Sequence, residues 1–272
     1  MSGLPRGAQT VDRQGLVDVD ALKRLLTCAC IDPCKFGVEG SKTLECLLRE
    51  IEHGESSLEW YTSVEPSGSK LRRVVTPVFV QLMWKDHVLV EVEQRANNGS
   101  VRRRNMLLAE KKAPSDKDAV AASFRGISEE LNLPHDFPPL NTLVSVLREC
   151  TCTELRESAS YPGLPSIYYT HHCALSLNDV GETHFKTIGL LEKSFETREP
   201  DKVNVWNWLQ IDEARAQKVK GFAPEPSPPR TDLSVHKAGA LLFRSMLWRM
   251  VSLPFYFVSK VKDVCVKVLG LR

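Results

Sequence analysis

The spacing of apolar residues changes near residue 70 of this 272-residue chain. Residues 16–31 and 41–52 place apolar side chains at helical spacing, and Ser41 is the expected N-cap of the second run. They predict a small helical N-terminal module over residues 1–66, which the segment SGSK at 67–70 links to the rest. Beyond it, β-branched runs at 74–84 and 87–95 predict a hairpin or meander.

One long amphipathic helix is predicted inside the strand-rich part, over residues 116–132. Ser115 or Asp116 is available as its N-cap. Its apolar stripe consists of residues spaced four, three and four apart, namely Val120, Phe124, Ile127 and Leu131. This stripe is expected to face a core.

Further strand-like segments surround this helix. They occupy residues 102–110, 142–152, 166–177 and 203–211, and a short helix is expected near 211–220. Trp206 and Trp208 would lie on the same face of the last strand, where we expect them in the core. This mixture of strands and helices predicts an α/β fold over residues 72–222.

Charge is unevenly distributed along the chain. The net charge is only +2, but residues 233–272 contain seven Lys or Arg side chains and a single acid, Asp263. Residues 1–232 therefore carry a net charge of −4. Because this part is mildly acidic, we expect no nucleic-acid partner.

The C-terminal part has a composition of its own. Residues 223–232 are rich in proline and predict a semi-rigid linker. Residues 233–272 combine bulky apolar side chains with a basic rim, which predicts an amphipathic helical tail. Such a tail suits peripheral contact with a membrane surface or with a partner protein. Packing on the body of the same chain is the alternative.

Eight cysteines are scattered along the chain, and no apolar segment typical of a secretory signal precedes them. We therefore expect reduced thiols and an intracellular, cytoplasmic protein, either free or attached peripherally to a membrane by its tail. Cys28, Cys30 and Cys34 match no strong zinc-binding spacing, so a structural role is favoured for them.

The stretch SFRGISEELNL, residues 123–133, holds the residues with the clearest chemical potential. Arg125 and Glu129 are four residues apart and share one face of a helix, and Glu130 adjoins them. Two adjacent carboxylates at a helix edge can ligate a hard cation such as Mg²⁺, which would polarise a phosphoryl oxygen or activate a water. The alternative is a solvated, ion-paired helix face.

This stretch resembles the signature of the Nudix hydrolase family, G-x5-E-x7-R-E-U-x-E-E-x-G-U, where U is a bulky aliphatic residue. The signature would occupy residues 111–133, and its arginine, both aliphatic positions and its paired glutamates match Arg125, Ile127, Glu129, Glu130 and Leu133. The resemblance extends over residues 72–215. It implies a Nudix-like α/β/α sandwich with a mixed sheet.

The resemblance also implies an activity and a metal. Hydrolysis of a nucleoside-diphosphate-linked compound with Mg²⁺ or Mn²⁺ would follow from it. Glu129 and Glu130 would hold the metal, and Arg125 would orient them as the third catalytic residue. For the substrate it suggests Lys111 as a phosphate contact, with Tyr161 or Tyr169 stacking on a base or sugar.

Four positions depart from the signature. Its opening glycine is Lys111, its first glutamate is Lys117, and the glutamate after the arginine is Gly126. Its later glycine is Asn132, which can adopt a positive φ and end a helix. The carboxylate missing at Gly126 is a metal ligand in the family, so the resemblance alone does not establish catalysis.

Two hypotheses follow from the incomplete signature. In the first, the chain binds and hydrolyses such a compound with the metal on Glu129 and Glu130, and a later glutamate, Glu196 or Glu199, could complete the metal shell. In the second, it is a catalytically impaired Nudix-fold binding or scaffold protein. Gly126 also costs a helix about 1 kcal/mol relative to alanine. It is therefore expected to admit a neighbouring backbone or a bound phosphate, or to mark the loss of a ligand.

Overall fold

The computed structural model describes residues 9–11, 18–62, 69–158 and 160–224. The chain divides into two units, Met1–Ala223 and Pro224–Arg272. The predicted tail at 233–272 and nearly all of the predicted linker at 223–232 lie outside the described residues. Within the described ranges, no helix is long and apolar enough to cross a membrane.

The described residues form ten strands, six α-helices and one short 3-10 helix. The strands are β1 (Gln9–Thr10), β2 (Ser56–Thr62), β3 (Ser69–Val75), β4 (Pro77–Trp84), β5 (His87–Ala96), β6 (Val101–Lys111), β7 (Val144–Glu157), β8 (Pro165–Leu177), β9 (Ser194–Arg198) and β10 (Lys202–Gln210). The helices are α1 (Val19–Cys28), η2 (Pro33–Lys35), α2 (Leu44–Glu52), α3 (Ala119–Glu130), α4 (Leu140–Leu143), α5 (Asp179–Thr187) and α6 (Ile211–Ala216).

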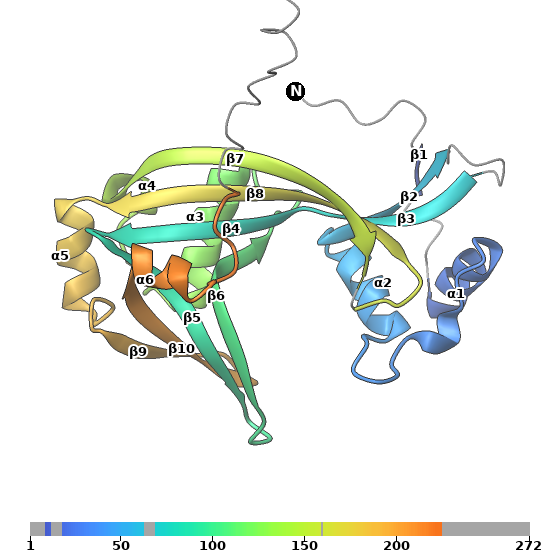
Figure 1. Cartoon of the computed structure of the whole chain (residues 1–272), viewed down its shortest axis with the longest axis horizontal. Helices are drawn as coiled ribbons and strands as arrows, with labels where there is room; N and C mark the ends of the chain where they lie inside the picture. The colour runs from blue at the N-terminus through green and yellow to red at the C-terminus, as the bar shows by residue number, and fades with distance from the viewer. Residues whose placement is uncertain (1–8, 12–17, 63–68, 159, 225–272) are drawn as a thin grey trace, which may run out of the picture. The chain divides into compact units, whose positions relative to one another are not determined.

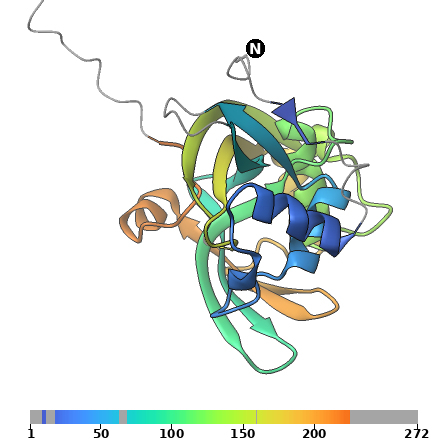
Figure 2. The same cartoon turned by 90° about the vertical axis from the view of Figure 1, so that its right-hand side faces the viewer.

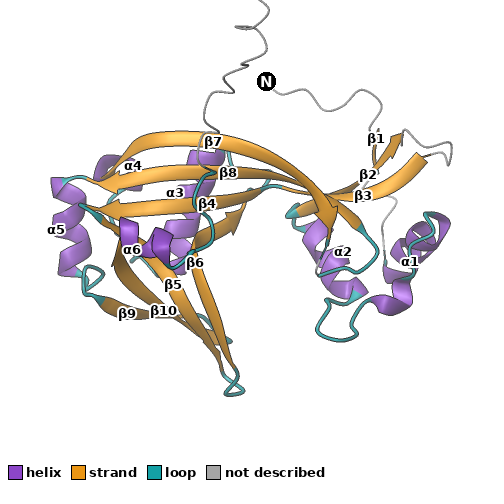
Figure 3. Cartoon of the chain, viewed as in Figure 1, coloured by secondary structure: helices purple, strands orange, loops and turns teal. Residues whose placement is uncertain are grey.

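All ten described strands belong to one mixed sheet (Figures 1 and 3). Its main path has the order β1-β2-β3-β8-β4-β6-β5-β10-β9, and β7 pairs with β8 beside this path. β8 runs parallel to β3 and β4, whereas β7 runs antiparallel to β8. The predicted α/β fold with a mixed sheet is confirmed.

Helices α1 and α2 occupy the two segments for which helical spacing predicted helices. Asp18 and Thr43 are their N-caps, and each side chain accepts a backbone hydrogen bond from the first turn. The prediction of Ser41 as the cap of α2 is therefore wrong. Both helices pack against β2 and β3 (Figure 2). The N-terminal residues are not only helical, however, because β1 and β2 lie within 1–66.

The predicted linker at 67–70 requires a correction. Ser69 and Lys70 are already the first residues of strand β3. Lys70 pairs with Tyr61 of β2 in an antiparallel ladder. The polar composition of this segment therefore hid a strand start, because β2 supplies the backbone hydrogen bonds that the local sequence does not indicate.

The main core lies between α3 and the central strands. Ile127 and Leu131 of the predicted stripe are buried, and Val120 and Phe124 are partly buried against the same cluster. Both tryptophans of β10 also belong to this core, as predicted.

The start of α3 differs from the prediction. Its N-cap is Asp118, whose side chain accepts a hydrogen bond from the Ala121 N–H at 2.8 Å. Neither Ser115 nor Asp116 caps the helix. The Asp116 side chain instead turns to Arg125, which is the beginning of the candidate site.

Candidate functional site

Helix α3 passes close to strand β6 at Gly126. A Cβ atom placed at Gly126 would lie 3.1 Å from Cβ and 3.3 Å from Cγ of Glu110. Such distances are shorter than ordinary van der Waals contacts, so glycine allows this close approach of helix and strand. A glutamate at 126, as the family signature would have it, needs space that Glu110 occupies.

Arg125 ties the loop before α3 to the C-terminal half of that helix. Its Nε and Nη2 donate to the Asp116 carboxylate at 3.1 and 3.0 Å, and Nη2 also donates to the Lys111 carbonyl at 2.9 Å. Its Nη1 donates to Oε2 of Glu129 at 3.1 Å and lies 3.3 Å from Oε2 of Glu110. The hydrogen bonds to Asp116 raise the pKa of Arg125, which keeps the guanidinium charged.

Asp116 is held in place by hydrogen bonds within the loop before α3. Its Oδ2 accepts a hydrogen bond from the Ala113 N–H at 2.7 Å, and its carbonyl accepts one from Nζ of Lys112 at 2.7 Å. The hydrogen bond from Arg125 lowers the pKa of Asp116, although burial opposes this shift. The loop thus presents an ionised carboxylate that holds Arg125 toward Glu129.

Glu130 faces the sheet rather than Arg125. The side-chain amide of Asn204 donates to Glu130 Oε2 at 3.2 Å and to Glu199 Oε1 at 2.7 Å. Burial raises the pKa of Glu130 to about 7, although Lys202 opposes the shift. Three further carboxylates add to it, namely Glu199, Glu91 and Glu110. Negative charge is therefore in excess around this side chain.

Two buried oxygen atoms in this neighbourhood have no hydrogen-bond partner within the described part of the chain. They are Oε1 of Glu91, a residue that is 4% exposed, and Oδ1 of Asn204, a residue that is fully buried. The other oxygen of Glu91 accepts from Nε of Arg104 at 3.0 Å. Burial also raises the pKa of Glu110. Unpartnered acceptors among carboxylates favour the binding of a proton or a cation.

The oxygen atoms around Glu130 suit Mg²⁺ in their chemistry, because hard cations prefer carboxylate and amide oxygens. They do not form a finished metal shell. In the ranges that the structure describes, no three His, Cys, Asp or Glu side chains are placed to hold one ion. Glu110 and Glu129 turn to Arg125, and Glu130 turns to Asn204. These residues fit a cation chemically and would have to rearrange to enclose one.

Lys111 is engaged by the N-terminal part of the chain. Its Nζ lies 2.6 Å from Oε2 of Glu55 and 3.4 Å from Oε1 of Glu50. Its backbone N–H donates to Glu110 Oε1 at 2.6 Å. The backbone of Lys111 therefore lies next to the carboxylates of the candidate site. Its ammonium is paired with acids outside that site.

The two tyrosines expected near the substrate are placed differently. Tyr161 is fully buried in the N-terminal core, where its ring contacts Phe36 and lies 5.1 Å from the Arg73 guanidinium. A ring without exposed surface cannot stack on a ligand, so this placement does not fit the expected role. Tyr169 lies on β8 opposite Thr153 of β7, with its hydroxyl buried. The structure does not join either tyrosine to Arg125.

Sequence analysis offered two later glutamates as additional metal ligands, and the structure brings one of them next to Glu130. Glu199 shares the amide of Asn204 with Glu130 and pairs with Lys202 at 2.9 Å. Glu196 lies on β9 and pairs instead with Arg95 at 2.7 Å. Asn132 has a φ of 52° directly after the end of α3, as expected for a residue that ends a helix.

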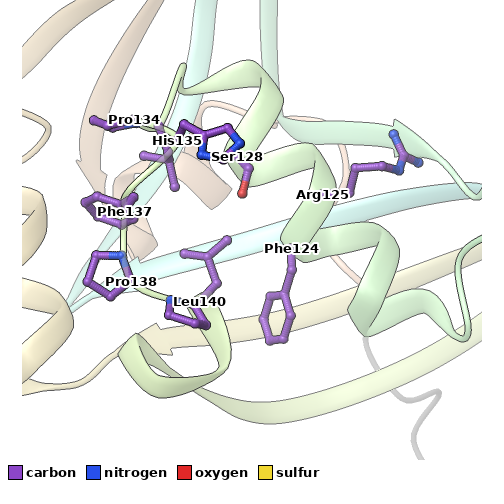
Figure 4. A pocket seen from close by; sticks show the side chains of 10 residues that line it. Phe124, Arg125, Ser128, Pro134, His135, Phe137, Pro138 and Leu140 are labelled. Carbon is purple, nitrogen blue, oxygen red and sulfur yellow. The ribbon is translucent and has the colours of Figure 1, made fainter.

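A pocket of about 350 Å³ lies on another side of α3. It is lined by Phe124, Arg125 and Ser128 together with residues of the loop from Leu133 to Leu140. Figure 4 shows the Arg125 side chain pointing away from that loop. Because Ser128 and Glu130 are two residues apart, they project from opposite faces of the helix. The pocket therefore borders the candidate site at Arg125, whereas Glu130 lies on the face of the helix opposite Ser128.

Four residues of the site were missed by sequence analysis, namely Glu91, Glu110, Asp116 and Asn204. Glu91 and Glu110 lie on neighbouring strands, and the alternation of side chains along a strand could have placed them on one face. Asp116 was interpreted as a cap. Asn204 carries no local signal, because only strand pairing brings β10 beside β5.

Comparisons with known proteins give only distant similarities. No family model matches the sequence, and no curated protein matches it. Among solved structures, the chain is similar to a Nudix hydrolase from Nitrosomonas europaea, at 18% identity, 55% coverage of this chain, 80% coverage of that chain and a TM-score of 0.30. It is also similar to an ADP compounds hydrolase, at 13% identity, with 73% and 89% coverage and a TM-score of 0.30. Because both TM-scores are low, we draw no conclusion about function from either similarity.

Proposed function

We propose that the region 72–222 binds a nucleoside-diphosphate-linked small molecule together with Mg²⁺ or Mn²⁺, and hydrolyses its pyrophosphate. The observation that carries the proposal is the environment of Glu130, whose pKa burial raises to about 7 among other carboxylates. A divalent cation would relieve this excess of negative charge. The match of Arg125, Glu129 and Glu130 to the Nudix signature supports the same interpretation.

Each residue has a proposed role in this site. Glu129 and Glu130 hold the cation, and Glu110 takes the place of the carboxylate missing at Gly126, whose lack of a side chain admits it. Arg125 positions Glu110 and Glu129 through Nη1. When bound, the cation supplies charge to polarise a phosphoryl oxygen and acidify water.

Substrate contacts are also part of the proposal. Lys111 would contact a phosphate as a point charge if the phosphate displaced Glu55, which is its half-exposed partner. Tyr169 stays a proposed contact because the residue is only partly buried. Tyr161 is not proposed, since it has no exposed surface.

A turnover assay tests this function. NDP-sugars, dinucleotides and NTPs are incubated with the full chain and Mg²⁺ or Mn²⁺, and the nucleotide products are separated and quantified. We expect turnover of at least one class, reduced at least about a hundredfold in Glu129→Gln and in Glu130→Gln. Glu52→Gln, an exposed change on α2, is the matched control and should retain full activity.

A second candidate function is binding without hydrolysis. It is favoured because the signature glutamate is missing at Gly126, and because the described residues do not form a finished shell of three metal ligands. Metal-dependent nucleotide binding without turnover of any compound in the panel would support this candidate over the first. Attachment to a membrane or a partner through residues 233–272 is a further proposal, which liposome co-sedimentation of the full and truncated chains tests.

A further inference from the structure

Strand β7 is long and has an open edge. It spans 14 residues, Val144–Glu157, and pairs along one side with β8. Its other side pairs with no strand in the described residues. Strands of globular proteins usually have about 5–6 residues, and proteins normally shorten, cover or charge such edges because they template pairing with another chain.

The exposed side chains of β7 include large apolar ones. Leu147 and Leu155 are 59% and 58% exposed, and Val146 is 48% exposed. They are three of the seven large hydrophobic residues that are exposed in the described part of the chain. Because apolar residues of this size favour burial, their concentration on one edge strand indicates a surface that is covered in the working protein.

We propose that β7 pairs antiparallel with β7 of a second copy of this chain, around a two-fold axis at Thr151. In this arrangement each residue faces the one equally far on the other side of Thr151. Arg148 then faces Glu154 of the second copy, and Leu147, the bulge residue between Val146 and Arg148, lies next to Leu155. Such an isologous interface repeats every contact twice and joins two sheets into one continuous sheet.

Charge and apolar complementarity together select this register. Opposite residues of antiparallel strands point to the same face of the sheet, so a two-fold axis must set one residue against its own copy. An axis at Cys152 sets Arg148 against Arg156, and an axis at Thr153 sets Glu149 against Glu157, both of which place like charges together. Only the register at Thr151 pairs Arg148 with an acid and also buries both leucines against each other.

Charge reversal and rescue test the pairing. Analytical ultracentrifugation of the full chain should show a concentration-dependent dimer. Arg148→Glu and Glu154→Arg should each weaken dimerisation at least about tenfold, because each sets two like-charge pairs across the axis. The double variant should restore it. Arg24→Glu on α1, an exposed residue with the same charge change, is the matched control and should leave it unchanged.

Cross-linking tests the register. Thr151→Cys, made with Cys150→Ser and Cys152→Ser, should form a disulfide between two copies under mild oxidation, because Cβ atoms directly opposite in a ladder are about 4.5–5.5 Å apart. Peptide mapping identifies the bond. Thr153→Cys in the same background should cross-link far less, since it would face Glu149.

Several results would overturn the proposal. One such result is a chain that stays monomeric at high concentration. The bulge between Val146 and Arg148 and the charged side chains of β7 would then prevent its open edge from pairing with another strand. A monomer whose β7 amides resist hydrogen exchange would assign the edge to another segment of the same chain. A dimer that tolerates both charge reversals, or in which the Thr151→Cys variant does not cross-link, would refute the Thr151 pairing.

Discussion

Glu50 on α2 offers the sharpest test of the electrostatics in this protein. It is 5% exposed, and its carboxylate contacts Arg73 Nη2 at 2.5 Å and Lys42 Nζ at 2.6 Å. Burial tends to raise its pKa, but Arg73, Lys42 and Lys111 together lower it from 4.5 to about 2. The perturbation is Glu50→Gln, which keeps the shape and removes the charge.

The magnitude follows from this pKa change. A lowering from 4.5 to about 2, at about 1.4 kcal/mol for each unit, corresponds to about 3 kcal/mol of folding free energy. Because the folded pKa lies below the unfolded one, this stability is fully present above pH 4.5 and is lost as pH falls toward 2. Glu50→Gln also leaves Arg73 buried without its partner, which adds to the loss.

Urea denaturation between pH 7 and pH 3 measures the effect. The free energy of unfolding of Glu50→Gln should be lower than that of the parent chain by about 3 kcal/mol at pH 7, and the gap should narrow as pH falls below 4.5. Glu52→Gln, exposed on the same helix, should stay within about 0.5 kcal/mol of the parent. A gap that is the same at pH 7 and pH 3 would refute the electrostatic reasoning.

Two further predictions concern α3. Gly126→Ala should lower the free energy of unfolding by about 1 kcal/mol, because overpacking against Glu110 outweighs the helix propensity gained. Ser128→Ala on the exposed face is the control and should not lower it. A Gly126→Ala variant that is more stable than the parent chain would contradict the close contact with Glu110. Mn²⁺ affinity, followed by electron paramagnetic resonance, should fall up to about tenfold per pH unit below 7, where Glu130 takes up a proton. In Glu130→Gln that pH dependence should flatten, and an unchanged profile would exclude Glu130.

Local patterns predicted much of the fold. Helical spacing located α1, α2 and α3, and β-branched runs located β4, β5 and β8. β2 and the start of β3 were missed, because SSLEWYT and the segment Ser69–Lys70 lack a clear alternation and gain their strand structure from pairing with each other. The short strand β9 was missed for the same reason, since β10 supplies its only described partner.

The site was predictable only on the helix. Arg125 and Glu129 form the expected i,i+4 pair at 3.1 Å, because helical spacing fixes their relation. Glu110 and Asn204 reach the site through sheet order, which no local pattern encodes. The meaning of Gly126 also depended on a neighbour 16 residues earlier in the chain, so its role as a contact point with Glu110 became visible only in three dimensions.

The central claim is that the carboxylates around Glu130 bind a divalent cation together with a nucleoside-diphosphate-linked compound. Isothermal titration of the full chain with ADP-glucose, with and without Mn²⁺, tests it most directly. The account predicts binding that requires the metal and weakens at least about tenfold in Glu130→Gln. Absence of binding at millimolar ADP-glucose with Mn²⁺, or equal binding by Glu130→Gln, would contradict it.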